Sequence, residues 1–507
     1  MRTPLIPLLV AVGAFAATPA TGQLSLDKSG GAVPGVANLF VDGTPGDVYA
    51  IVLATYEQTS QPLPGLTLNV PLDLLSLSLQ LPGFAGLLNG AGKATGTLAV
   101  PALASLVGLT LSAQAIGGFG LDQVSNLVRL TLATPGTFAD TLGAPVLPIA
   151  GGATAVLADG SLLFAGGSGP LAQRYDPRIE EWELAGASFG VGLFSQSTAL
   201  ADGRILFTGG LDLATGQPTS AAALWDADTG TTVELNMLSA RAAHGASLLS
   251  NGRVLISGGF QSVAIGDPTD LLAVFLAAFQ GLIPSSEFFD PNTESFVAGP
   301  NMLEPRAFHT STALNNGDVL VAGGMTLLPI VNIPTVSSTA YQFVPAFNTW
   351  GLPKFFSGAR LAHSAVKLTD GSVLLAGGLT LDLTAFLTSG DFTTIAIGSL
   401  NSVLRYTGGF FGGFAGAGTL SESRAGAGMA ALPGGGALIV GGFKLVLSAS
   451  EVDLGTTASS DRYTPGQGVS ATGAMGSARL FPLLVPLADG TVLVVGGGAT
   501  DTEVYQL

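Results

Sequence analysis

The 507-residue sequence contains no cysteine, which excludes disulfide bonds, thiolate metal sites and nucleophilic thiols. It also has little charge, because charged residues make up 10% of the chain, against about 25% in an average soluble domain. Its 18 basic residues stand against 34 acidic ones, for a formal net charge of −16. Nucleic-acid binding depends on a basic surface, so we expect no nucleic-acid partner.

Long apolar runs are missing as well. No stretch offers the roughly 20 uninterrupted apolar residues that a spanning helix needs, so we expect no membrane span. At the N-terminus, Arg2 precedes a short apolar run from Leu5 to Ala17, and small residues follow at 20–22. This layout is typical of a signal peptide. We therefore predict a signal peptide over residues 1–22 and a secreted mature chain, either extracellular or at the cell surface.

Glycine is abundant, at 72 of 507 residues, and much of it belongs to a phrase that occurs seven times. In each copy a turn ending in glycine precedes a run of Val, Leu and Ile that ends in a second glycine. Asp-Gly and Asn-Gly supply the positive φ angles of a two-residue hairpin turn, and the apolar run is typical of a strand buried on both faces. The two glycines are six residues apart in every copy: Gly160 and Gly166, Gly203 and Gly209, Gly252 and Gly258, Gly317 and Gly323, Gly371 and Gly377, Gly435 and Gly441, Gly490 and Gly496.

A second phrase follows each hairpin and carries aromatic residues. In three copies two aromatics stand seven apart across a turn, for example Tyr175 and Trp182. This spacing predicts a second hairpin whose rings pack between neighbouring repeats. The mean period is about 55 residues, close to the ~50 of a kelch unit. With its repeated Gly-Gly and following aromatics, the chain resembles the kelch family from about residue 136 onward, and the resemblance implies four-stranded propeller blades.

The predicted fold is all-β: a seven-bladed kelch-type β-propeller over residues 136–507 with a β-sandwich before it. The last blade ends at Leu507 after a third strand, so we expect residues 136–142 to supply the fourth strand and close the ring. Residues 24–134 hold about seven short apolar or alternating strands, which favours a small sandwich. This segment resembles a β module of secreted bacterial proteins, on the matching stretches 92–98, 108–115 and 124–126.

The loops between the second and third strands are long in blades three to six, and we call these insertions the crown. In kelch folds they emerge on one face, together with the loops from strand four to the next strand one. The crown is unusually apolar, at residues 270–284, 325–336 and 379–387. It either packs on itself as a lid or exposes an apolar patch to a partner or to the N-terminal module.

Five arginines occupy equivalent positions, each 11 residues before a turn glycine: Arg241, Arg306, Arg360, Arg424 and Arg479. We predict that these ring arginines line the central channel and bind the ligand. In kelch relatives, arginines at this turn contact acidic partner segments, so the resemblance implies an anionic ligand. The alternative is that they hydrogen-bond loop carbonyls between blades, as buried guanidinium groups must.

The three histidines, His244, His309 and His363, each follow a ring arginine by three residues. Three neighbouring imidazoles admit a metal site, but the position belongs to the repeat consensus, so we assign no metal and no other cofactor to them.

Some kelch propellers are secreted copper-radical oxidases that need a tyrosine cross-linked to a cysteine. The chain has no cysteine, so that cofactor cannot form, and it also lacks the sialidase-type Ser-x-Asp-x-Gly-x-Thr-Trp box. No Ser-His-Asp order or paired-carboxylate motif stands out from the repeat consensus, so we predict that the protein is not an enzyme. We predict instead a monomeric binding module for an unknown extracellular protein or glycan, contacted through the crown and the ring arginines. One alternative is a structural extracellular or cell-surface component. A second is a carbohydrate-active or oxidase-like enzyme with a different site.

Overall fold

The structure is a computed structural model. It describes residues 23–507 except 64–65, 150–152, 158, 166–170, 189, 227–228, 262–273, 275–277, 328–332, 390–395, 410–411 and 448–451. The predicted signal peptide lies outside the described residues. Antiparallel strands dominate the rest, which confirms the all-β prediction. Over the described part of the chain, no helix is long and apolar enough to cross a membrane.

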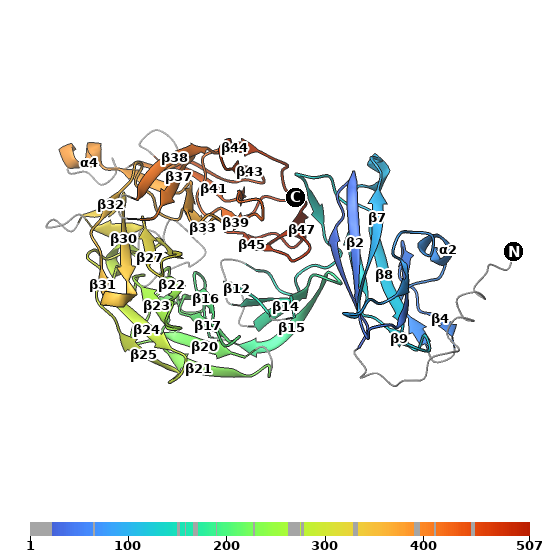
Figure 1. Cartoon of the computed structure of the whole chain (residues 1–507). Coiled ribbons are helices and arrows are strands. Elements are labelled where there is room, and N and C mark those ends of the chain that lie inside the picture. Colours follow the sequence, from blue (N-terminus) through green and yellow to red (C-terminus); the bar gives the residue numbers. More distant parts are fainter. Residues whose placement is uncertain are drawn as a thin grey trace.

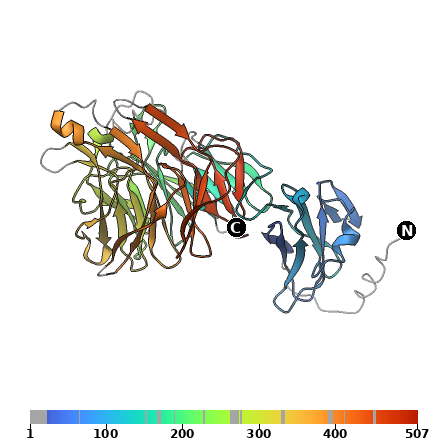
Figure 2. The ribbon, with the colours of Figure 1, turned by 90° about the horizontal axis from the view of Figure 1, so that it is seen from above.

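The N-terminal module consists of two sheets that face one another across a buried core (Figures 1 and 2). Leu26 and Leu39 from one sheet pack with Ile51 and Val128 from the other. The first sheet holds β1 (Ser25–Gly30), β2 (Gly35–Asp42) and β7 (Lys93–Val100), and the second holds β10 (Val128–Thr131), β8 (Thr110–Gly117), β3 (Val48–Ala54) and β6 (Ala85–Leu87), with β9 (Gln123–Val124) beside β8. The hairpin β4 (Ser60–Leu63) and β5 (Leu66–Leu68), the helix α2 (Leu75–Ser78) and the 3-10 turn η1 (Ala104–Leu106) complete it.

The second part of the chain forms a ring of antiparallel sheets, the blades, visible in Figure 1. The inner strands of successive blades lie side by side around the central channel. From inner to outer strand, blade one is β12 (Ala153–Val156), β13 (Leu162–Ala165), β14 (Leu171–Asp176) and β15 (Glu181–Ser188); blade two is β16 (Gln196–Ala199), β17 (Ile205–Thr208), β20 (Ala221–Trp225) and β21 (Thr232–Asn236); and blade three is β22 (Gly245–Leu248), β23 (Val254–Ser257), β24 (Ser286–Asp290) and β25 (Ser295–Ala298). Blade four is β26 (Thr310–Ala313), β27 (Val319–Ala322), β30 (Thr339–Val344) and β31 (Thr349–Trp350), with β32 (Lys354–Phe355) beside β30, and blade five is β33 (Ser364–Lys367), β34 (Val373–Ala376), β37 (Ser402–Thr407) and β38 (Gly413–Thr419). Blade six is β39 (Gly428–Ala431), β40 (Ala437–Val440), β43 (Ser460–Thr464) and β44 (Gly468–Ala471), and blade seven is β45 (Leu483–Pro486), β46 (Val492–Val495), β47 (Thr502–Tyr505) and β11 (Phe138–Asp140). A 3-10 turn, η3 (Pro345–Phe347), links β30 to β31.

The ring is closed by the strand that precedes the first repeat. β11 pairs with β47, with Phe138 opposite Tyr505, as the sequence predicted. Between blades seven and one, Phe164 and Val495 share a buried apolar cluster, and similar clusters fill each of the other boundaries between blades. The predicted aromatic pairs lie in these clusters, with the rings of Tyr175 and Trp182 5.0 Å apart. Apolar packing therefore holds the ring together without disulfides.

The repeated hairpin turns differ from the prediction in length. In blade three the amide of Gly252 donates to Leu249 O over 3.0 Å, and the amide of Leu249 donates to Arg253 O over 2.8 Å. Gly252 has a φ of 83°, whereas Asn251 is outside the positive-φ region. Asn251 contributes its side chain instead, because its Oδ1 accepts from the amide of Arg253. The turn is thus a three-residue loop with one left-handed glycine, not a two-residue turn with two positive φ angles.

The described parts of the crown pack on one another over the channel. Phe279, Met325, Leu379 and Leu445 come from four different insertions and share one buried cluster, which matches the lid alternative. Parts of 270–284 and 325–336 lie outside the described residues. The lid contains η2 (Phe279–Gly281), the hairpin β28 (Met325–Leu327) and β29 (Pro334–Val336), α4 (Thr384–Ser389), and a sheet of β35 (Leu379–Asp382), β36 (Ala396–Ser399), β41 (Phe443–Leu447) and β42 (Val452–Thr456), while blade two adds the hairpin β18 (Leu211–Asp212) and β19 (Gln217–Pro218).

Candidate functional site

A cavity of about 510 Å³ lies in the central channel, between the lid and the inner strands. Its lining comes from the segments that enter the inner strands, so residues far apart in the sequence meet around one axis. Polar groups come from Gln196 on β16, Ser364 on β33 and three histidines, and apolar groups come from three phenylalanines and Met429. The described lining contains no Asp, Glu, Lys or Arg side chain. We call this space the channel cavity.

Three phenylalanines separate the channel cavity from the lid. Phe194, Phe308 and Phe481 line the cavity and also pack against the buried lid cluster. The ring centroids of Phe194 and Phe308 are 5.2 Å apart, and those of Phe194 and Phe481 are 5.4 Å apart, both edge-on. All three residues have left-handed backbones, with φ between 51° and 60°. This conformation is uncommon for residues other than glycine, and here it recurs at one position of the repeat.

These phenylalanines were not among the site residues predicted from the sequence. Each stands two residues after the ring-arginine position, where blades three and five have Ala243 and Ala362. Comparing this one position across the repeats would have found them. Their common place at the channel needs the ring to be closed, however, because they come from blades two, four and seven.

The three histidines line the channel cavity but are almost fully buried, with exposed fractions of 2–7%. Nε2 of His244 lies 2.9 Å from the Thr208 hydroxyl, and Nε2 of His363 lies 3.1 Å from the Thr310 hydroxyl. Each imidazole packs against a closing glycine of the preceding blade, as His309 does against Gly258. Within the described residues, no three His, Cys, Asp or Glu side chains are grouped so that they could hold a metal ion.

Burial lowers the pKa of all three histidines. The pKa of His309 falls to about 3, because burial disfavours the imidazolium and the guanidinium groups of Arg306 and Arg241 repel it. The pKa values of His244 and His363 also lie well below the ordinary value, first from burial and then from the neighbouring arginine and His309. The channel cavity therefore presents neutral imidazoles at physiological pH.

The burial of His309 predicts a loss of stability in mild acid. A histidine whose folded pKa is depressed takes up its proton more readily when unfolded, so stability is full above the unfolded pKa of about 6.5 and falls as the pH drops towards the folded pKa. At pH 5, His309 alone is expected to cost about 2 kcal/mol. Urea unfolding at pH 7 and pH 5 checks this: a His309→Gln variant should lose less stability than wild type between the two pH values. If wild type and His309→Gln lose the same stability between pH 7 and pH 5, the depressed pKa of His309 is not the cause of the loss.

The ring arginines are fully buried, at 0% exposure, and paired within the chain. In each, Nη1 donates to the carbonyl of the first closing glycine of its own blade, as Arg241 does to Gly258 O over 2.7 Å. The backbone carbonyl of Arg241 accepts from the amide of Gly210 in the preceding blade, and the other four repeat this contact. Four of the five also form ion pairs: Arg241 with Glu287, Arg306 with Glu304, Arg424 with Asp461, and Arg479 with Glu503 and Asp501.

These contacts match the structural alternative for the arginines more closely than the ligand-binding one. The guanidinium groups bond carbonyls within a blade, while their backbones join one blade to the next. Burial lowers the pKa of Arg360 to about 10, and the partners of its guanidinium among the described residues are carbonyls and a hydroxyl, with no carboxylate to oppose the shift. None of the five arginines is among the described residues that line the channel cavity. Ligand binding by these arginines remains a prediction.

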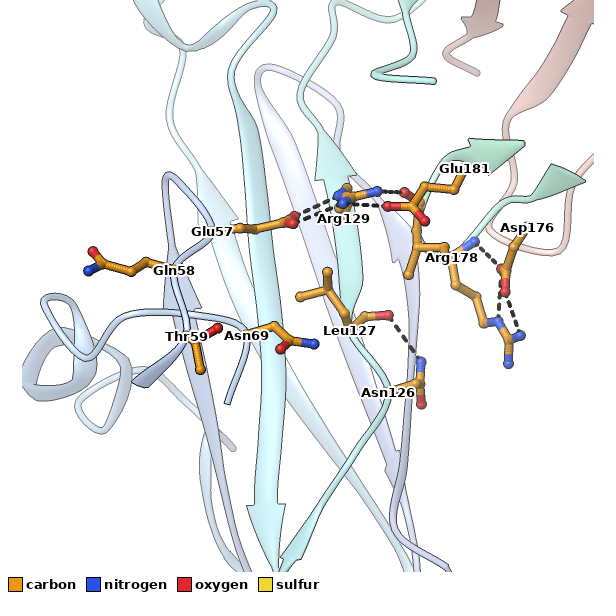
Figure 3. A pocket seen from close by; sticks show the side chains of 11 residues that line it. Glu57, Gln58, Thr59, Asn69, Asn126, Leu127, Arg129, Asp176, Arg178 and Glu181 are labelled. Carbon is orange, nitrogen blue, oxygen red and sulfur yellow. Dashed lines mark hydrogen bonds and ion pairs between the residues drawn. The ribbon is translucent and has the colours of Figure 1, made fainter. Parts of the chain in front are cut away.

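A second concave region lies where the N-terminal module meets blade one (Figure 3). Arg129 on β10 forms its centre. Its Nε and Nη2 donate to the two carboxylate oxygens of Glu57 over 2.6 and 2.8 Å, and Nη2 also lies 2.8 Å from Glu181 of blade one. The amide of Arg129 donates to Arg178 O over 2.7 Å. The hydrogen bonds from Arg129 hold the pKa of Glu57 below its ordinary value. These ion pairs of Arg129 were not predicted from the sequence.

Comparison with known proteins does not assign a function to this chain. No protein-family model matches the sequence, and no curated protein matches it. Among solved structures, the chain is similar to YjhT, with 15% identity over 65% of this chain and 98% of that one, at a TM-score of 0.48. It is also similar to a fungal alcohol oxidase of the AA5 family in complex with copper, with 14% identity over 63% of this chain and 74% of that one, at a TM-score of 0.36. At these values neither likeness says what this chain binds.

The second structure corrects one prediction. We expected from the missing cysteine and the lack of catalytic motifs that the protein is not an enzyme, but one of the structures to which the chain is similar is an alcohol oxidase. The missing cysteine excludes only a site built on a tyrosine cross-linked to cysteine. The prediction that the protein is not an enzyme is therefore withdrawn.

Proposed function

We propose that this chain is a secreted binding protein that takes an uncharged glycan in the channel cavity. The observation that carries the proposal is the lining: three phenylalanines, neutral histidines, and hydroxyl and amide groups, with no charged side chain among the described residues. At about 510 Å³ the cavity falls within the usual range for small-ligand sites, about 300–1,000 Å³.

The charge of the lining decides the class of ligand. An anionic ligand would need a cation in contact, but the ring arginines already bond carbonyls and carboxylates outside the cavity. A cationic ligand would need a carboxylate, and none lines the described cavity. Placing a charged ligand among neutral groups in a partly enclosed space costs several kcal/mol. An uncharged ligand avoids that cost.

The mixture of apolar and polar groups favours a sugar among uncharged ligands. A sugar ring has an apolar C–H face, which packs on the faces and edges of phenylalanine rings such as Phe308. Its hydroxyls both donate and accept hydrogen bonds, and so does the amide of Gln196. The lid closes the crown end of the channel, above the phenylalanines. The lining of the channel cavity therefore continues along the inner strands, towards the opposite face of the propeller.

A Phe308→Ala variant tests the proposal on an array of uncharged oligosaccharides, followed by titration of the saccharide that binds. Alanine stands at the equivalent left-handed position as Ala243, so the backbone tolerates the change. We expect affinity to fall at least about tenfold, or about 1.4 kcal/mol, because the aromatic contact is lost. Phe347→Ala on the outer rim of the same blade, where the side chain is 79% exposed, is the matched control and should bind like wild type.

Phe308 also packs in the lid cluster, so a second variant separates binding from folding. Gln196→Ala removes a polar group of the cavity without touching that cluster, and we expect it to weaken the same saccharide while leaving the melting temperature near that of wild type. Wild-type affinity in both variants, or no saccharide bound by the wild type, would refute the proposal.

A further inference from the structure

The junction between the N-terminal module and the propeller carries a groove that the channel proposal does not use. Two cavities, of about 490 and 500 Å³, share Glu57, Arg129 and Glu181 in their linings. The ion pairs of Arg129 with Glu57 and Glu181 therefore form a bridge between the two cavities. We call the two cavities together the junction groove. Figure 3 shows the first of them, with the N-terminal module on one side and the turn of blade one on the other.

Buried contacts fix the two walls of the junction groove. Nζ of Lys28, 7% exposed, lies 3.4 Å from the carboxylate of Glu180, which is 3% exposed, and also donates to Arg129 O. The amide of Gly30 donates to Asp489 O in blade seven over 3.2 Å. A groove whose walls are already ordered loses little entropy when it binds a ligand.

One wall offers polar groups that the protein does not use. Gln58, Thr59 and Asn69 line the first cavity and are exposed, and their side chains have no hydrogen bond to any described residue. In Figure 3 these side chains lie across the cavity from Arg178 and Glu181. By contrast, Asn126 in the floor is committed to Leu26 and Leu127 of its own module. The unused amides and hydroxyl can donate and accept at the same site.

The second cavity adds an aromatic side chain. Tyr56 lines it, with 48% of the residue exposed, and its hydroxyl is anchored to Asp73. An exposed, anchored ring offers a flat apolar face with little freedom to lose. A ligand long enough to cross the bridge would meet this ring at one end and the unused amides at the other.

The charges of the junction groove exclude an anionic ligand. The first cavity holds the carboxylates of Glu57, Asp176 and Glu181 against the guanidinium groups of Arg129 and Arg178. Both arginines are already paired, Arg129 with Glu57 and Glu181 and Arg178 with Asp176. The three carboxylates are paired with these same two arginines, so a charged ligand of either sign would have to displace an ion pair of the lining. An uncharged ligand avoids that cost, and its hydroxyls can also bond the exposed Glu181.

We infer that the junction groove is a second binding site, for an uncharged oligosaccharide that lies across the Glu57, Arg129 and Glu181 bridge. It takes an extended chain of sugars, whereas the channel cavity takes a compact one. Because both modules contribute walls, saccharide binding also stabilises their docking. The site is independent of the channel cavity, so either can exist without the other.

The test uses the full chain and uncharged gluco-, manno-, galacto- and xylo-oligosaccharides of increasing length. A Gln58→Ala, Asn69→Ala double variant should weaken the longer saccharides about tenfold, because two side chains that contact them are lost. Tyr56→Ala should weaken them as well. Gln61→Ala, an exposed glutamine on the adjoining strand β4 that does not line either cavity, is the matched control and should bind like wild type.

The channel variant separates this inference from the channel proposal. Phe308→Ala should leave binding to the junction groove unchanged. If the double variant and Gln61→Ala bind equally well, the inference is overturned. It is also overturned if Phe308→Ala abolishes all saccharide binding, or if the wild type binds none of these saccharides.

Discussion

Replacing Glu287 with alanine is expected to destabilise the fold by about 3–5 kcal/mol, because it leaves the guanidinium of Arg241 buried without a counter-charge. The two side chains are 1% and 0% exposed, and Nη2 of Arg241 lies 2.5 Å from Oε1 of Glu287. The Glu287 carboxylate also accepts from the amides of Leu238 and Ser239, so the change removes the partner of two part-buried donors as well. Burial already lowers the pKa of Arg241, and Glu287 is the group that opposes this.

Urea unfolding followed by circular dichroism measures the loss. Glu183→Ala is the matched control: Glu183 also pairs with an arginine, but its side chain is 64% exposed, and such pairs contribute less than about 1 kcal/mol. Glu287→Gln should fall between the two, since the amide oxygen still accepts a hydrogen bond. A loss in Glu287→Ala no larger than that in Glu183→Ala would show that Arg241 does not depend on this carboxylate.

Replacing Lys28 with methionine is expected to cost about 3 kcal/mol and to uncouple the two modules. Glu180, 3% exposed, would keep a carboxylate in the interface without its nearest cation. Glu180 of blade one also accepts a hydrogen bond from the amide of Leu142, in the segment that links the two modules. Its carboxylate therefore contacts both the N-terminal module, through Lys28, and this linking segment. If these junction contacts couple the unfolding of the two parts, the wild type shows one thermal transition and the variant shows two.

Differential scanning calorimetry checks this result. Lys93→Met is the matched control, because Lys93 pairs with Asp42 on the same module but both side chains are more than half exposed. A Lys28→Met, Glu180→Gln double variant should recover part of the loss, because the buried Glu180 carboxylate is no longer left without its cation. A single transition at the wild-type temperature in Lys28→Met would contradict this account of the junction.

The repeats made most of the architecture predictable. Each turn glycine and closing glycine marks a hairpin whose strands are neighbours in sequence, so local patterns are enough to place them. The closing strand β11 could also be predicted, because the last repeat lacks one strand and an unpaired edge is unfavourable. Only the turn was misjudged, since Asn251 bonds through its side chain and leaves the left-handed conformation to Gly252.

The sites were harder to predict, because they depend on contacts between repeats. The sequence shows that the ring arginines share one position of the repeat, but their pairing with carbonyls and carboxylates appears only in the folded blades. Phe194, Phe308 and Phe481 look like isolated aromatics until the ring brings them together. The missing cysteine and the missing motifs were informative about particular kinds of site only, and the prediction that the protein is not an enzyme was wrong.

The sequence by itself determined the β class and the hairpins, because turn chemistry and apolar alternation act over a few residues. The tertiary structure alone decided which side chains share a cavity. The channel cavity joins Thr154 to Leu484, and the junction joins Lys28 to Glu180 and Asp489. Such contacts span hundreds of residues and depend on ring closure and module docking, so no local pattern encodes them.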